Sequence, residues 1–127
     1  MQKTLKSEVV FTGVGLHCGR DVTLRVRPAA AQTGIWFRRT DVSDADPYIS
    51  ANWQCAVHTA LCTRLVNADG LGVSTVEHVM AAIAGCGINN AVVDEFHVWF
   101  CISFRGSIFN ITIKYFKAFL KTGFINC

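Results

Sequence analysis

Apolar and polar residues alternate along several short stretches of the chain. In residues 22–27 (VTLRVR) apolar side chains occupy every second position, and threonine and two arginines occupy the positions between them. Successive side chains of a β-strand point to opposite faces, so this pattern predicts a half-buried strand with one hydrated face. Further strands are predicted at residues 9–15, 35–39, 61–66, 71–73 and 88–94.

The spacing becomes helical after residue 74. Ser74 and Glu77 fit a capping box, in which the two side chains satisfy each other's backbone N–H groups, so we expect a helix to begin at Ser74. Gly85 or Gly87 can end it. His78 would point away from the apolar stripe of this helix. That stripe consists of Val76, Val79, Met80 and Ile83.

Several strands with one buried helix predict an α+β fold, with a sheet and a helix stacked as two layers. The composition changes abruptly near Glu95. Residues 1–95 carry eight basic and nine acidic side chains, whereas residues 96–127 carry four basic side chains and no acidic one. We therefore expect a domain at residues 1–94 and a divergent basic, aromatic tail at residues 95–127. We also expect the strand that ends near Asp94 to lie at an open sheet edge.

The tail allows two interpretations. Residues 111–122 place three lysines on one helical face and apolar residues on the other, which is typical of a helix lying on an anionic membrane. The abrupt change in composition favours the alternative, a segment with no selected fold. The slightly acidic domain carries no nucleic-acid-binding motif, so we expect no nucleic-acid partner.

The sequence also bears on the compartment. It has no long uncharged apolar run and no signal-like N-terminus, which predicts a cytoplasmic protein. The six cysteines form no C-x-x-C pair, so we expect reduced thiols that pack as small core residues.

Two local clusters could carry chemistry. Glu77 and His78 are adjacent, and an imidazole can bind zinc while a carboxylate takes a proton from water. Their spacing alone is a weak signal, since a helix cap and a satisfied core histidine would look the same. The G-x-G of residues 13–15 lacks the third glycine of a nucleotide fingerprint, and a hairpin turn is the simpler interpretation.

Four segments together resemble one family. They are residues 12–17 (TGVGLH), 37–41 (FRRTD), 61–63 (LCT) and 74–85 (STVEHVMAAIAG). In this order and spacing they are similar to the UDP-3-O-acyl-N-acetylglucosamine deacetylases of lipid A biosynthesis. The resemblance runs from about Leu5 to Asp94, the first of that family's two domains and roughly a third of a full-length member.

The resemblance implies hydrolysis of the N-acetyl group of a UDP-linked, acylated glucosamine. It implies a Zn²⁺ ion held by two histidines and an aspartate, with His78 as the first ligand and Glu77 as the general base. Further positions match residues that line the family's active-site region: Leu16, His17, Leu61, Cys62 and Thr63.

No family feature is recognisable after Asp94, including the remaining zinc ligands. A catalytic zinc site uses about three protein ligands, so we expect this truncated chain alone to bind zinc poorly and to be inactive. The alternative is a non-catalytic remnant or binding module that keeps the N-terminal fold.

Overall fold

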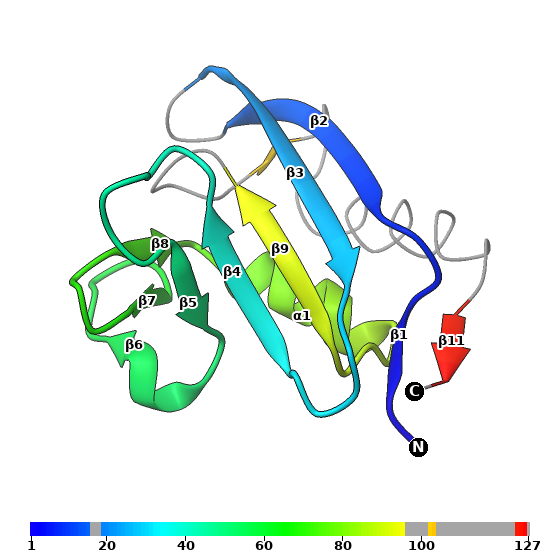
Figure 1. Cartoon of the computed structure of the whole chain (residues 1–127). Coiled ribbons are helices and arrows are strands. Elements are labelled where there is room, and N and C mark those ends of the chain that lie inside the picture. The colour runs from blue at the N-terminus through cyan, green and yellow to red at the C-terminus, as the bar shows by residue number, and fades with distance from the viewer. Residues whose placement is uncertain (16–18, 96–101, 104–123, 127) are drawn as a thin grey trace.

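The structure is a computed structural model of the chain, and it describes residues 1–15, 19–95, 102–103 and 124–126 (Figure 1). Its strands and helices follow one another along the chain as β1 (Lys3–Leu5), β2 (Val9–Gly15), β3 (Asp21–Pro28), β4 (Ile35–Arg39), β5 (Tyr48–Ser50), the 3-10 helix η1 (Trp53–Cys55), β6 (Ala56–Val57), β7 (Arg64–Val66), β8 (Gly72–Ser74), α1 (Glu77–Gly85), β9 (Ala91–Glu95), β10 (Ile102–Ser103) and β11 (Phe124–Asn126).

The largest sheet is mixed and has the strand order β10-β2-β3-β9-β4-β5. Neighbouring strands are antiparallel, except that β4 and β9 run parallel. Strand β9 therefore lies inside the sheet, and the expectation that it forms an open edge is wrong. Both of its partners, β3 and β4, come from earlier in the chain, and they cover both of its hydrogen-bonding sides.

The predicted alternation is confirmed in β3 and β4. Leu24, Val26 and Phe37 are buried, whereas Thr23 and Arg25 are exposed. Two other strands are shorter than predicted, because the segment at 61–66 forms β7 only from Arg64 and the segment at 88–94 forms β9 only from Ala91.

Helix α1 packs behind the sheet, against the buried face of β3, β9 and β4 (Figure 1). Its side chains Val79, Ala82 and Ile83 are buried and join Val26 and Val93 in one hydrophobic core. Burial of such side chains is the main driving force for this docking, at about 1.5–3 kcal/mol for each large one. The result is one mixed sheet with one helix, an α+β domain.

The predicted helix start is wrong. Ser74 is the last residue of β8, and α1 begins at Glu77 with Val76 in the N-cap position and no side-chain cap. The chain turns at Thr75, whose φ is +64°. The backbone N–H groups of Thr75 and Val76, the two residues before α1, donate to the carbonyl oxygen of Thr63. The other end agrees with the prediction, since α1 ends at Gly85 and Gly87 follows with a φ of +71°.

Two smaller sheets accompany the large one. Strands β6, β7 and β8 form an antiparallel sheet that leads directly into α1, and β1 pairs with β11. The predicted amphipathic helix at 111–122 lies outside the described residues. Within the described part of the chain, no helix is both long and apolar enough to cross a membrane. Cys55, Cys62 and Cys86 are free thiols of intermediate burial, and the other three cysteines lie outside the described residues.

Candidate functional site

Glu77 and His78 form the first turn of α1, where β8 delivers the chain to the helix. Both side chains are half-buried. The carboxylate of Glu77 lies at the helix N-terminus, where unpaired backbone N–H groups favour negative charge. The helix thus holds the two candidate residues side by side at the margin of the core.

The Leu61–Thr63 loop packs against this turn. The backbone N–H of Thr63 donates a hydrogen bond to Glu77 Oε2 with an N···O distance of 3.1 Å. The Thr63 carbonyl oxygen accepts from the N–H of Thr75 at 2.8 Å and from that of Val76 at 3.4 Å. Both polar groups of the Thr63 backbone are thereby joined to the turn that carries Glu77. The structure brings Glu77 and Thr63 together, although they lie far apart in the sequence.

The other residues of this loop differ in exposure. Leu61 is 96% exposed, whereas Cys62 is half-buried. The hydroxyl of Thr59 donates to the Cys62 carbonyl oxygen and lies 3.7 Å from its Sγ atom. The contacts between Thr59 and Cys62 therefore hold the loop together beside Glu77, while the Leu61 side chain points into solvent. Leu16 and His17, the other two predicted lining residues, lie outside the described residues.

The donor set near α1 suits one corner of a zinc site. His78 can supply an imidazole nitrogen to the metal, and the carboxylate of the adjacent Glu77 can take a proton from water. Among residues 1–15, 19–95, 102–103 and 124–126, no three histidine, cysteine, aspartate or glutamate side chains gather closely enough to hold a metal ion. A catalytic zinc site takes about three protein ligands, so the described residues do not fit a complete one.

A buried arginine anchors the strand that leads to the site. Arg39 on β4 donates from Nη1 to the Gly72 carbonyl oxygen of β8 at 2.9 Å. Its Nε and Nη2 atoms donate to the two carboxylate oxygens of Asp41 at 2.7 and 2.6 Å. The hydrogen bonds and charge of Asp41 raise the pKa of Arg39 despite its burial. The FRRTD segment therefore joins β4 to β8 through Arg39, a structural role that its composition did not predict.

Glu95, which lies opposite Arg39 where β9 pairs with β4, is also a buried titratable residue. It is 3% exposed, and neither carboxylate oxygen has a hydrogen-bond partner in the part of the chain that the structure describes. Burial raises its pKa to about 8, although the positive charge of Arg39 opposes this rise. Glu95 is therefore largely neutral at pH 7.

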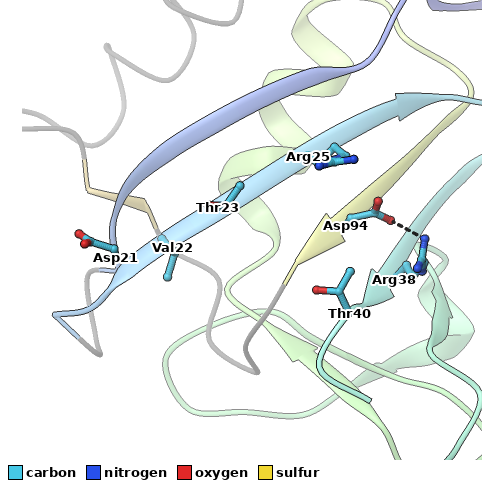
Figure 2. A pocket seen from close by; sticks show the side chains of 7 residues that line it. All are labelled: Asp21, Val22, Thr23, Arg25, Arg38, Thr40 and Asp94. Atoms are coloured by element: carbon cyan, nitrogen blue, oxygen red, sulfur yellow. Dashed lines mark ion pairs between the residues drawn. The ribbon is translucent and has the colours of Figure 1, made fainter. Parts of the chain in front are cut away.

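An open pocket of about 450 Å³ lies on the face of the sheet opposite α1 (Figure 2). Its polar centre is Asp94, which accepts two 2.8 Å hydrogen bonds from Arg27 and lies 3.8 Å from Arg38. The pocket is lined by Asp21, Val22, Thr23, Arg25, Arg38, Thr40 and Asp94. None of the predicted site residues is among them. The pocket and the Glu77–His78 turn are thus separate features on opposite faces of the sheet.

Known proteins resemble this chain over the same region. Residues 2–96 match the family described as UDP-3-O-acyl N-acetylglycosamine deacetylase. The UDP-3-O-acyl-N-acetylglucosamine deacetylases of Aliivibrio fischeri and Photobacterium profundum are each 54% identical to this chain over 93 residues, and that of Vibrio cholerae is 55% identical over 93 residues. The aligned segment covers 73% of this chain and 30% of each relative. The resemblance seen in the four sequence motifs is confirmed, and the chain belongs to the UDP-3-O-acyl-N-acetylglucosamine deacetylase family.

Proposed function

We propose that this chain supplies the N-terminal part of a deacetylase that removes the acetyl group from the nitrogen of UDP-3-O-acyl-N-acetylglucosamine, a step of lipid A biosynthesis. The observation that carries the proposal is the family match over residues 2–96, which includes Glu77, His78 and the Leu61–Thr63 loop. The relatives named above carry this substrate in their names.

Glu77 is the proposed general base. One of its carboxylate oxygens, Oε2, accepts the hydrogen bond from Thr63, and Oε1 on the same carboxylate can take a proton from an attacking water molecule. A base held by a backbone N–H on a packed loop keeps a fixed direction, which favours proton transfer in one geometry. Thr63 supports the base through its main chain in this proposal.

His78 is the proposed zinc ligand. His78 is followed by Val79, whose side chain is buried in the core. The backbone that carries His78 is therefore held in place. The remaining ligands would come from residues outside those that the structure describes. Because no family feature is recognisable in the sequence after Asp94, we propose that the 127-residue chain by itself binds zinc weakly and hydrolyses little or no substrate.

A hybrid enzyme tests the proposal. Residues 2–95 of this chain would replace the matching segment of the Vibrio cholerae relative, and zinc content and deacetylation would be measured. Glu77→Gln should lower kcat by at least about a hundredfold with zinc content unchanged, because a general base contributes about 10²–10⁴-fold. His78→Ala should lower both zinc content and activity.

Glu8→Gln serves as the matched control, since Glu8 is half exposed and pairs loosely with Arg25 at 3.6 Å. It should leave the hybrid fully active. A hybrid that keeps its kcat after Glu77→Gln, or its zinc after His78→Ala, would refute the roles given to these residues.

A non-catalytic binding module is the second candidate, and the incomplete donor set around His78 favours it. In that case the hybrid would fold and yet lack activity before any substitution is made. Circular dichroism of the hybrid, compared with that of the intact relative, separates this outcome from misfolding.

A further inference from the structure

Thr75 adopts a backbone conformation that its side chain disfavours. Its φ is +64°, in the left-handed region that glycine and asparagine enter readily and β-branched residues rarely do. Thr75 is 4% exposed, and its hydroxyl has no hydrogen-bond partner among the described residues. Two unfavourable features thus coincide at the residue two positions before Glu77. Such strain persists only where surrounding interactions enforce it.

The enforcing interactions come from Thr63. The Thr63 carbonyl oxygen accepts from the N–H of Thr75 at 2.8 Å, and the Thr63 N–H donates to Glu77 Oε2 at 3.1 Å. The two peptide groups that flank Thr63 therefore hold the turn at two points, Thr75 and Glu77, one on each side of Val76. With a right-handed φ at Thr75, the chain would leave β8 in another direction and α1 would start elsewhere.

We propose that Thr63 and Thr75 are positioning residues that aim the Glu77 carboxylate through their backbones. The left-handed turn at Thr75 directs the chain so that Glu77 reaches the Thr63 N–H. The side chains of both threonines are dispensable for this task, since neither makes a hydrogen bond that holds Glu77. Thr63 thus has a backbone role in place of substrate lining, and the catalytic consequence of this role depends on the proposed function of Glu77.

Hydrogen exchange of the Thr63 amide in the 127-residue chain tests the geometry without any activity. Glu77→Ala, which removes the acceptor, should speed this exchange by about tenfold. Thr75→Pro should do the same, because proline has a φ near −65° and no N–H to donate to Thr63. Thr75→Asn and Thr63→Ala should stay within about twofold of the native rate, since asparagine tolerates the left-handed region and alanine keeps the N–H.

Gln32 provides the matched control. It is the other non-glycine residue with a φ of +64° among the described residues, and its N–H donates to Gln2 Oε1 at 2.7 Å, far along the chain from Glu77. Gln32→Pro should disturb its own loop and leave the Thr63 amide unchanged. The amide of Val93 in β9 reports whether each variant remains folded. An unchanged Thr63 amide in Glu77→Ala, or in folded Thr75→Pro, overturns the proposal.

The hybrid enzyme supplies a second readout if Thr75→Pro does not fold. Thr63→Pro deletes the N–H that binds Glu77 and keeps the carbonyl that binds Thr75. It should lower kcat at least about tenfold with KM within about twofold, whereas Glu8→Gln, at a half-exposed residue outside the site, keeps kcat. If Glu77→Gln lowers kcat and Thr63→Pro does not, the positioning role is wrong and the proposed function stands. If Glu77→Gln has no effect, the proposed function fails, and the exchange data still decide the geometry.

Discussion

Glu95 lies directly opposite Arg39 in the parallel ladder of β4 and β9, yet the two side chains form no ion pair within the described structure. The guanidinium of Arg39 is engaged by both carboxylate oxygens of Asp41 and by the Gly72 carbonyl. Asp41 neutralises Arg39 and adds a negative charge near Glu95, so burial dominates and the pKa of Glu95 rises to about 8.

We expect this burial to make the fold less stable as the pH rises. A carboxyl whose pKa is raised from 4.5 to about 8 on folding binds its proton more tightly in the native state. Stability is therefore lost between these two pH values, and the free energy of unfolding should fall by roughly 2 kcal/mol from about pH 6 to about pH 8. Urea unfolding followed by circular dichroism at several pH values measures this slope.

Glu95→Gln should flatten that slope, because the amide keeps the shape of the side chain and cannot ionise. Glu8→Gln is the control, since Glu8 is half exposed and its variant should keep the native pH dependence. A slope that survives in Glu95→Gln would show that another group controls the loss of stability.

The Arg27–Asp94 pair should stabilise the sheet more than the neighbouring Arg25–Glu8 pair. Asp94 is largely buried and accepts both hydrogen bonds of Arg27 at 2.8 Å, which join β3 to β9 and raise the pKa of Arg27. Asp94→Asn should lower the free energy of unfolding by about 1–3 kcal/mol, the usual range for hydrogen bonds to charged groups.

The exposed Arg25–Glu8 pair spans 3.6 Å with both side chains about half exposed. Truncating it should change stability by at most about 1 kcal/mol. Double-mutant cycles on the two pairs, read by thermal unfolding, give the two coupling free energies. Equal coupling would contradict the importance assigned to burial and two-fold hydrogen bonding at Asp94.

The sequence predicted those features of the fold that depend on neighbouring residues. Alternation identified β3 correctly because the burial of Leu24 and Val26 follows from strand geometry alone. It missed the interior position of β9, which depends on pairing with β3 and β4 across long stretches of chain. The order of the strands in the sheet could thus be obtained only from the structure.

The start of α1 shows, at the candidate site, the same limit of prediction from local sequence. Ser74 and Glu77 satisfy the local pattern of a capping box, but Ser74 ends β8, and the Glu77 carboxylate accepts its hydrogen bond from the backbone N–H of Thr63. The motif resemblance singled out Glu77 and the Leu61–Thr63 loop, yet no local pattern could show that they touch. Thr75 was missed because its sequence gives no sign of a positive φ, for which glycine or asparagine is the usual signal.

A substitution of Leu61 can separate an effect on core packing from an effect on substrate binding. Its side chain is 96% exposed, so it contributes little to the core, and Leu61→Ala should change the free energy of unfolding by no more than about 0.5 kcal/mol. In the hybrid enzyme, the same variant should raise KM if Leu61 contacts substrate. Phe37→Ala is the contrasting control, since Phe37 is fully buried and its loss should cost about 3–5 kcal/mol. An unchanged KM with unchanged stability would remove Leu61 from the predicted lining.

Zinc binding by the 127-residue chain should be weak, with no defined stoichiometry. Among the described residues the proposed site offers one imidazole, that of His78, and a single protein ligand competes poorly with water for a metal that takes about three protein ligands in catalytic sites. Calorimetric titration with zinc chloride should therefore give low heats that change little in His78→Ala. In the hybrid enzyme, His78→Ala should instead abolish the bound zinc, because there the imidazole would act together with other ligands. Tight one-to-one binding by the chain alone, lost in His78→Ala, would contradict this prediction and would mean that further ligands lie among the residues after Glu95 or at positions 16–18.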